Sequence, residues 1–248
     1  MSRKLPDFLI IGGQRCGTSS LYRYLSLHPY TARATKKEVH YFSTRFFLDI
    51  DWYKTHFPDE GFTGEGSPYY FFHPQSPQRV YETLPDVKLV LLLRNPVDRA
   101  HSQFWHEVRM SFEELPVFEW ALDVESVRLK GEREKMAADP LYNSYYHIHG
   151  SYLSRGLYHE QLVRWLKWFP REQIMIVKSE DFYSDPDEKY NDVLRFLGLP
   201  EHHLEEYEVV LKGEYPPMND ETRKQLSDFF KQPNEELYEL IGENYGWQ

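Results

Sequence analysis

The stretch FLIIGGQRCGTSSLYRYL, residues 8–25, joins a short apolar run to a helical pattern through a turn that contains glycine. Glycines let the backbone turn tightly, so that successive N–H groups point into one concavity. The start of a helix adds N–H groups that have no intrahelical acceptor, together with the positive end of the helix dipole. The stretch therefore predicts a phosphate or sulfate site. The alternative is a ligand-free turn capped by Ser and Thr.

This loop departs from the phosphate-binding loop of nucleoside triphosphatases. It reads G-x-x-x-x-G-T-S, so Thr18 stands where those enzymes carry a lysine. The later run KLVLLL is followed by Arg94 instead of by the Asp that helps to hold Mg²⁺. An arginine repels a metal and attracts a second anion, and Ser102 follows it about two helical turns later. We predict two anion sites, one at residues 15–20 and one at Arg94 with Ser102, and no metal site.

Apolar runs and helical patterns alternate along the chain, which is typical of an α/β domain with a mostly parallel sheet. The predicted strands are residues 8–11, 89–93 and 174–177, with a weaker candidate at 61–65. The predicted helices are residues 18–27, 97–108, 158–169, 190–197 and 222–241. The charged stretch 116–146 has little periodicity and is assigned either to a helical insertion or to an excursion that faces a substrate. We expect one domain over residues 1–248.

Composition excludes several classes of protein. The formal net charge of −10 argues against a nucleic acid partner, because such proteins usually carry a basic surplus. The single cysteine, Cys16, excludes an intramolecular disulfide. We find neither a signal peptide nor a run approaching about 18 apolar residues, so we expect no membrane span. These features predict a cytoplasmic protein, most simply a bacterial one.

Six motifs occur in one order along nearly the whole chain. They are GGQRCGTSSL (12–21), KKEVHYF (36–42), GEGSPYY (64–70), LLLRNPVDRAHSQF (91–104), RGLYHEQLVRWLKWFPREQI (155–174) and KGEYPPMNDETRKQL (212–226). This ordered set resembles the sulfotransferases that use 3′-phosphoadenosine 5′-phosphosulfate (PAPS), in the branch of the heparan sulfate sulfotransferases, as a bacterial-type member. The resemblance implies a P-loop-kinase-like domain and metal-free, in-line transfer to a hydroxyl or amine, with 3′,5′-ADP as product.

The resemblance also implies roles for matching positions. Glu38 matches the general base, and Lys37 and His40 flank it. Arg15 takes the place of a catalytic lysine; since arginine keeps its proton, we expect it to stabilise the leaving phosphate electrostatically. The implied contacts to PAPS come from Arg15, Cys16, Gly17, Thr18, Ser19 and Ser20 at the 5′ end, Arg94 and Ser102 at the 3′ end, and Tyr158, Lys212, Gly213 and Tyr215 elsewhere.

The sequence departs from the family pattern at Arg15, in the short and less basic late loop KGEYP, and in lacking the cysteine pair of many animal relatives. Several interpretations stay open. Glu38 has the spacing of a surface carboxylate paired with Lys36 or Lys37, and serves as a base only if its proton affinity is raised. His56 resembles the histidine base of small-molecule sulfotransferases, but its context favours a helix and loop.

For two groups of residues, packing or surface exposure is an alternative to a role in the site. His101 and His106 are assigned to packing or to the surface. An aromatic and histidine cluster either lines an acceptor cleft or packs internally; it comprises Tyr142, Tyr145, Tyr146, His147 and His149.

The alternatives for function are a Mg²⁺-dependent nucleotide or small-molecule kinase and a non-catalytic module that binds PAPS or another anion. The acceptor is open among carbohydrates, lipids, carrier-tethered groups and small alcohols or amines.

Overall fold

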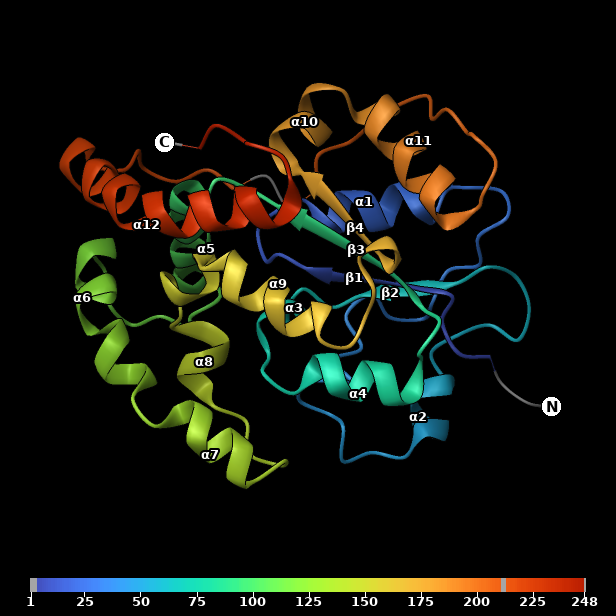
Figure 1. Cartoon of the computed structure of the whole chain (residues 1–248), viewed down its shortest axis with the longest axis horizontal. Coiled ribbons are helices and arrows are strands. Elements are labelled where there is room, and N and C mark those ends of the chain that lie inside the picture. Colours follow the sequence, from blue (N-terminus) through green and yellow to red (C-terminus); the bar gives the residue numbers. More distant parts are fainter. Residues whose placement is uncertain (1–3, 211–212, 248) are drawn as a thin grey trace. The chain divides into compact units, whose positions relative to one another are not determined.

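The computed structural model describes residues 4–210 and 213–247 (Figure 1). The chain divides into two compact units. The sheet unit extends to Leu93 and resumes at Trp165, and the helical unit runs from Arg94 to Arg164 and includes the C-terminal residues from 213 onward. The chain thus leaves the sheet unit directly between Leu93 and Arg94. The expectation of a single domain over residues 1–248 stays a prediction.

In the described part of the chain, the sheet has four strands in the order β2-β1-β3-β4, all parallel. The strands are β1 (Phe8–Gly12), β2 (Gly64–Gly66), β3 (Lys88–Leu93) and β4 (Ile174–Lys178). They match the four predicted apolar runs within a few residues. β1 and β3 are apolar almost throughout because parallel strands of this kind are buried on both faces. The predicted α/β class is confirmed, and the carboxyl ends of all four strands lie at one edge.

Helices cover both faces of this sheet (Figure 1). On one side lie α1 (Thr18–Leu25), α10 (Ser179–Ser184) and α11 (Pro186–Leu197), and on the other α3 (Tyr69–Phe72) and α4 (Ser76–Thr83). The unit also contains α2 (Ile50–Lys54) and receives the end of α9 (Tyr158–Leu166), which starts in the helical unit.

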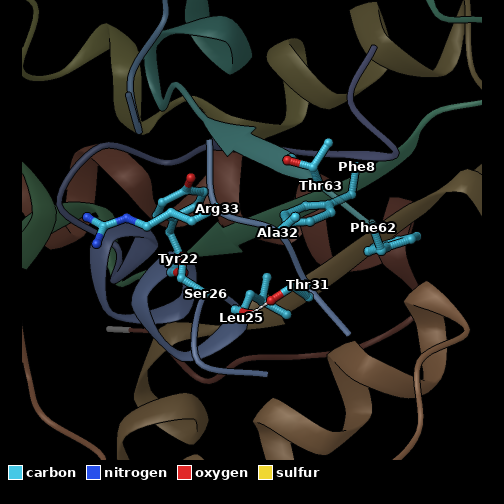
Figure 2. Close-up of a pocket in the computed structure, with 10 residues that line it drawn as sticks. Phe8, Tyr22, Leu25, Ser26, Thr31, Ala32, Arg33, Phe62 and Thr63 are labelled. Atoms are coloured by element: carbon cyan, nitrogen blue, oxygen red, sulfur yellow. Dashed lines mark hydrogen bonds between the residues drawn. The ribbon is translucent and has the colours of Figure 1, made fainter. Parts of the chain in front are cut away.

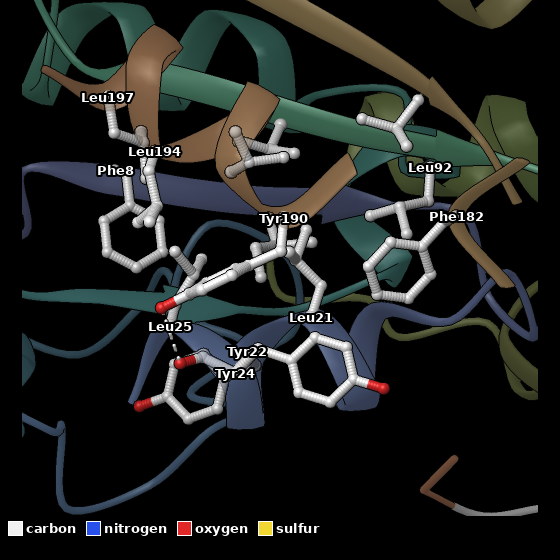
Figure 3. Close-up of a cluster of buried hydrophobic side chains, with 14 of the residues drawn as sticks. Phe8, Leu21, Tyr22, Tyr24, Leu25, Leu92, Phe182, Tyr190, Leu194 and Leu197 are labelled. Atoms are coloured by element: carbon white, nitrogen blue, oxygen red, sulfur yellow. Dashed lines mark hydrogen bonds between the residues drawn. The ribbon is translucent and has the colours of Figure 1, made fainter. Parts of the chain in front are cut away.

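The core of the sheet unit follows from the alternation of strand side chains (Figure 3). Phe8 and Leu92 point to the same layer, where Leu21 of α1 and Leu194 of α11 pack against them. Each such side chain contributes roughly 1.5–3 kcal/mol when buried. This packing fixes α1, and with it the loop before α1, on the end of β1.

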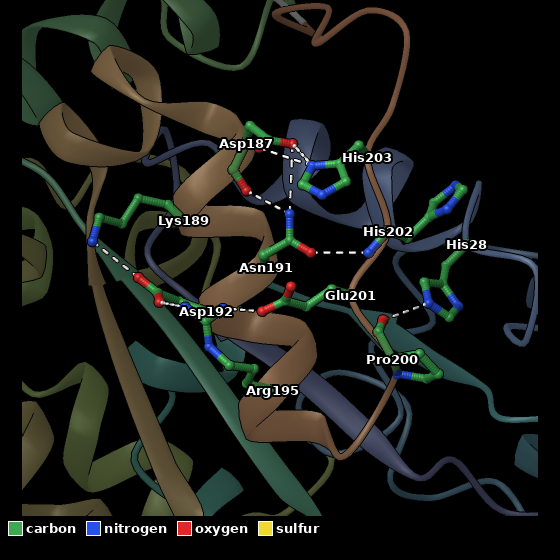
Figure 4. Close-up of polar contacts among 10 residues, drawn as sticks. All are labelled: His28, Asp187, Lys189, Asn191, Asp192, Arg195, Pro200, Glu201, His202 and His203. Atoms are coloured by element: carbon green, nitrogen blue, oxygen red, sulfur yellow. Dashed lines mark hydrogen bonds and ion pairs between the residues drawn. The ribbon is translucent and has the colours of Figure 1, made fainter.

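Side chains anchor the segment that follows α11 (Figure 4). His28 Nε2 lies 3.0 Å from the carbonyl of Pro200, and the N–H of His202 donates to Asn191 Oδ1 at 2.9 Å. Asp187, near the start of α11, accepts from His203 Nδ1 at 2.8 Å. The segment therefore returns along α11 toward α1 within the sheet unit.

The helical unit consists of short helices around an aromatic core. They are α5 (Pro96–Arg109), α6 (Phe118–Leu129), α7 (Glu132–Ala138), α8 (Tyr145–His149), a 3-10 turn η1 (Ser154–Gly156) and α12 (Asp220–Ile241). Phe104, Phe118, Tyr152 and Phe230 are fully or almost fully buried in this core. The stretch 116–146 contains α6, α7 and the start of α8, in line with the helical alternative, and Glu113 joins it to the preceding loop through two hydrogen bonds from Arg128. Within residues 4–210 and 213–247, the helices are too short or too polar to span a bilayer.

Candidate active site

The loop between β1 and α1, residues 13–17 (called the anion loop after its predicted role), turns tightly onto the N-terminus of α1. The N–H of Gly13 donates to the carbonyl of Leu92 at 2.6 Å, and the N–H of Cys16 donates to the carbonyl of Gly13 at 3.2 Å. Gly17 is the N-cap residue of α1, with φ of 95°. Because glycine offers no capping oxygen, the first N–H groups of α1 have no side-chain cap within the described chain. An anion at this position would supply the missing acceptors.

Two glycines of the loop are required by close approach or by backbone conformation. A Cβ atom on Gly12 would lie 2.6 Å from Cβ of Phe71, which is closer than real atoms pack. At Gly17 the backbone is left-handed, and a Cβ atom would lie 2.9 Å from the hydroxyl oxygen of Tyr183. Arg15 also has a left-handed backbone, with φ of 67°, which is uncommon for a residue other than glycine. Such conformations concentrate at functional sites.

The side chains of the loop divide into inward and outward groups. Cys16 and Ser20 are fully buried, and Ser20 Oγ accepts a hydrogen bond from the N–H of Val210 at 2.9 Å. Their side chains therefore serve packing and anchoring, and binding of a ligand through their backbone stays a prediction. Thr18 is also buried, whereas Arg15 and Ser19 are partly exposed.

Glu38 lies between two basic side chains of its own segment. Lys37 Nζ is 2.7 Å from Oε1, and His40 Nε2 is 3.3 Å from Oε2. Burial raises the pKa of this carboxyl, but the His40 hydrogen bond and the charge and hydrogen bond of Lys37 outweigh burial and lower the pKa to about 2. The raised proton affinity that a base requires is thus not present in this conformation. The side chain is 43% exposed.

The segment that carries Glu38 is fixed to β2 and α3 through its backbone. The N–H of Gly66 donates to the carbonyl of Lys37 at 3.0 Å. The N–H groups of Val39, His40 and Phe42 donate to side chains of residues 65–70. Since Gly12 packs on Phe71, the anion loop and this segment are both held on the carboxyl edge of the sheet by residues 65–71. Glu65, at the centre of this contact, was not among the predicted site residues.

The predicted 3′-phosphate residues belong to the helical unit. Arg94 follows β3 directly and Asn95 caps α5, accepting from the N–H of Val97 at 3.0 Å. The hydroxyl of Tyr158, a buried side chain, donates to the carbonyl of Arg94 at 2.9 Å. Ser102 lies on α5 and is also buried. Tyr158 thus helps to fix the position of Arg94 by binding the backbone carbonyl of Arg94.

The late loop is described from Gly213 onward, and Lys212 lies outside the described residues. A Cβ atom on Gly213 would be 3.4 Å from Nη2 of Arg109, on α5. The ring of Tyr215 packs edge-on against His101, with 5.2 Å between ring centres. Burial lowers the pKa of His101, and the charges of Arg223 and Arg94 lower it further against the opposing effect of Asp98 and Glu119. The packing role expected for His101 agrees with this burial.

The remaining candidate residues belong neither to the segment of Glu38 nor to the group around Arg94. His56 follows α2, packs edge-on against Trp52 and lies 3.2 Å from the hydroxyl of Thr35, so the expected helix-and-loop context is confirmed. The aromatic and histidine cluster is mixed, since His147 is buried whereas Tyr145 and Tyr146 are exposed.

One small pocket lies at the opposite edge of the sheet from the anion loop (Figure 2). It is lined by Phe8 and Gly64, the first residues of β1 and β2, and by Tyr22, Arg33 and Thr63 among others. It is therefore separate from the predicted nucleotide site.

Comparison with known proteins decides the family. The family model for the sulfotransferase domain matches residues 5–215. The chain belongs to the sulfotransferase family. This sulfotransferase is 30% identical to the membrane-associated sulfotransferase kil1 of Dictyostelium discoideum, over 98% of the chain and 67% of that relative. It is 28% identical to the mouse heparan sulfate glucosamine 3-O-sulfotransferase 3A1, over 99% of the chain and 65% of the relative. The predicted resemblance and enzyme class are confirmed.

Solved structures agree with this assignment. A sulfotransferase from Alicyclobacillus acidocaldarius is 33% identical, with a TM-score of 0.78 and 97% of each chain covered. The sulfotransferase domain of the curacin biosynthetic pathway, at 13% identity and a TM-score of 0.52, shares the fold. The chain matches only 30% of a bifunctional heparan sulfate N-deacetylase/N-sulfotransferase of Caenorhabditis elegans, so that relative has much more sequence than this domain.

Proposed function

We propose that this sulfotransferase transfers the sulfuryl group of PAPS to a hydroxyl or amine. The observation that supports the proposal is that a glycine turn follows β1 and Arg94 follows the neighbouring strand β3, in a chain that matches the sulfotransferase domain. Neither strand end carries the lysine or the Asp of a triphosphatase. The family match also counts against the kinase alternative.

The 5′ end of PAPS would lie in the anion loop. The N–H groups at the start of α1 and the hydroxyl groups of Thr18 and Ser19 would hold the 5′-phosphate. Arg15 would stabilise the negative charge that develops on the leaving phosphate oxygen. PAPS itself supplies the activated sulfuryl group. The two glycines and the capping geometry of Gly17 support this part of the proposal.

Residues of the helical unit would bind the 3′ end of PAPS. Arg94 would bind the 3′-phosphate by charge-assisted hydrogen bonds, and Ser102 would add a hydroxyl from α5. Tyr158 would hold the Arg94 backbone in place. Gly213 and Tyr215, together with Lys212, would close the late loop over the nucleotide. A protein site for the 3′-phosphate would favour 3′,5′-ADP over 5′-AMP, which lacks this phosphate.

Glu38 is the proposed base. It would take the proton from the acceptor oxygen or nitrogen while the S–O bond to the acceptor forms, or the S–N bond to an amine, and the bond to the 5′-phosphate breaks with its electron pair on the phosphate. With a pKa of about 2, the carboxylate is ionised but only weakly basic. We propose that the bound anionic donor draws Lys37 away from Glu38, which raises the proton affinity of the carboxylate.

The acceptor is proposed only by class. Relatives named for heparan sulfate, one of them as a glucosamine 3-O-sulfotransferase and one as an N-sulfotransferase, support a carbohydrate hydroxyl or amine. The net charge of −10 works against a highly anionic polymer. Lipid, carrier-tethered and small alcohol acceptors belong in the same assay panel. Cytoplasmic location and bacterial origin stay predictions.

A ligand comparison tests the proposal. Thermal unfolding is measured with 3′,5′-ADP, 5′-AMP, ADP and ATP–Mg²⁺, and transfer from ³⁵S-labelled PAPS is assayed on the acceptor panel. We expect 3′,5′-ADP to stabilise the chain most, by about 2.7 kcal/mol at 100 times its Kd. Equal stabilisation by ATP–Mg²⁺ would favour the kinase alternative, and stabilisation without transfer to any acceptor would favour the binding module.

A further inference from the structure

Glu65 is a fully buried carboxylate at the centre of β2. Its Oε1 accepts hydrogen bonds from the hydroxyls of Tyr53 at 3.0 Å and Tyr70 at 2.7 Å. Its Oε2 accepts from the N–H of Val39 at 3.1 Å and the hydroxyl of Ser67 at 2.5 Å. A carboxylate accepts all four donors, whereas an amide of the same shape would place a donor against donors.

Two of these hydroxyls also accept a hydrogen bond from a backbone N–H group. Ser67 Oγ accepts from the N–H of His40 at 3.1 Å, and the oxygen of Tyr70 accepts from the N–H of Phe42 at 3.3 Å. Since each hydroxyl accepts an N–H on one side, its own hydrogen is directed to Glu65. Three N–H groups of residues 39–42 are thus linked to this carboxylate by hydrogen bonds. Val39 donates to it directly, and His40 and Phe42 are each linked to it through one hydroxyl.

The segment held in this way is the one that carries the proposed base. It extends from Lys37, whose carbonyl accepts from the N–H of Gly66, to Phe42, and it includes both Glu38 and His40, whose ring contacts Glu38. His40 has a left-handed backbone, with φ of 58°, a conformation that persists only where surrounding contacts enforce it. The hydrogen bond from its N–H to Ser67 is one such contact.

We propose that Glu65 is a positioning residue for sulfuryl transfer, which sets the backbone of residues 39–42 and thereby the placement of Glu38 and His40. The inference rests on the proposed role of Glu38. Glu65 acts through hydrogen bonds inside the sheet unit and does not itself contact the reacting atoms. Misplacement of a catalytic group by about 1 Å costs up to about 100-fold in rate.

The four donors provide a matched comparison. Ser67→Ala removes a hydroxyl that links Glu65 to the N–H of His40. Tyr53→Phe removes a hydroxyl that donates to the same carboxylate, and this contact involves no N–H group of residues 39–42. Both variants delete one buried hydrogen bond to Glu65, so a purely structural role predicts similar effects of the two on turnover.

Backbone hydrogen exchange and steady-state kinetics are measured for wild type, Ser67→Ala, Tyr53→Phe and Glu65→Gln. We expect Glu65→Gln to speed exchange at the Val39, His40 and Phe42 amides, and Ser67→Ala to speed it at the His40 amide, while protection in β1 and β3 is kept. We expect kcat to fall by about 10- to 100-fold with an unchanged KM for PAPS. Tyr53→Phe should keep wild-type exchange at these amides and wild-type kcat.

Equal kcat in Ser67→Ala and wild type, or an equal loss in Tyr53→Phe and Ser67→Ala, would overturn the inference. The exchange measurement needs no reaction, so it separates this inference from the proposed function. If wild type transfers no sulfuryl group, the proposed function fails, whereas unchanged exchange at Val39, His40 and Phe42 in Glu65→Gln means that Glu65 does not hold this segment.

Discussion

Lys37 and Glu38 are adjacent in sequence and form an ion pair, with Nζ 2.7 Å from Oε1. The ring of His40 lies 3.3 Å from the other carboxylate oxygen. Together these contacts lower the pKa of Glu38 to about 2 despite burial, so the group is ionised over the whole working range of pH. The acid limb of the pH–rate profile of the free enzyme therefore cannot come from Glu38 while Lys37 holds it.

Replacing Lys37 should change the shape of that profile. Lys37 lowers the pKa of Glu38, so Lys37→Met raises it toward the ordinary value of about 4.3. Below the raised pKa Glu38 is protonated and cannot accept a proton, and kcat/KM falls. We expect a new acid limb when log kcat/KM is measured from about pH 3 to pH 8. Lys36→Met is the control and should keep the wild-type shape; identical shapes for Lys37→Met and wild type would contradict the pairing argument.

Glu38→Gln tests the base directly. The amide keeps the shape of the side chain but cannot take a proton, so we expect kcat to fall by about 10²–10⁴-fold. Affinity for 3′,5′-ADP, measured by calorimetry, should be unchanged. His56→Ala is the matched comparison for the alternative histidine base and should keep full activity. Near-wild-type turnover in Glu38→Gln would remove Glu38 from the mechanism.

Arg94→Met should weaken recognition of the 3′-phosphate alone. Loss of hydrogen bonds from a charged group costs about 1.5–3 kcal/mol, which is about 10- to 150-fold in the Kd for 3′,5′-ADP. Affinity for 5′-AMP should not change, because that ligand lacks the second phosphate. Tyr158→Phe should cause a smaller loss of the same kind, since it removes only the hydroxyl that holds the Arg94 carbonyl. Equal losses for both ligands in Arg94→Met would argue that this arginine supports the fold instead.

The parts of the fold that could be predicted are those with a strong local cause. β1 and β3 are apolar on both faces, and the glycines after β1 mark a turn, so their positions follow from the sequence. The short helix α3 was missed because its sequence, YYFF, has no polar face and reads as an apolar run. α11 starts four residues before the predicted helix because Asp185 caps it, accepting from the N–H of Glu188 at 3.2 Å.

The site was predicted less completely, because its electrostatics depend on side-chain directions. The sequence left open whether Glu38 pairs with a neighbouring lysine. The structure shows the pair with Lys37 and the contact with His40, and these lower the pKa that a base would need raised. Glu65 did leave a signal, since a lone carboxylate between Gly64 and Gly66 in a short strand must find buried donors. Its partners lie 12 and 26 residues earlier and up to five residues later in the chain, and periodicity does not reveal such pairs.

Gly17→Ala should separate the anion-binding role of the loop from its backbone cost. Gly17 and Gly131 are both N-cap residues with positive φ, of 95° and 76°, so alanine at either position costs roughly 1 kcal/mol of stability. A Cβ atom at Gly17 also meets the Tyr183 hydroxyl at 2.9 Å, whereas at Gly131 it meets nothing within 4 Å. We expect both variants to lower the Tm, and only Gly17→Ala to weaken 3′,5′-ADP binding, by about 10-fold or more, because the first N–H groups of α1 shift. Unchanged ligand affinity in folded Gly17→Ala would show that these N–H groups do not bind the phosphate.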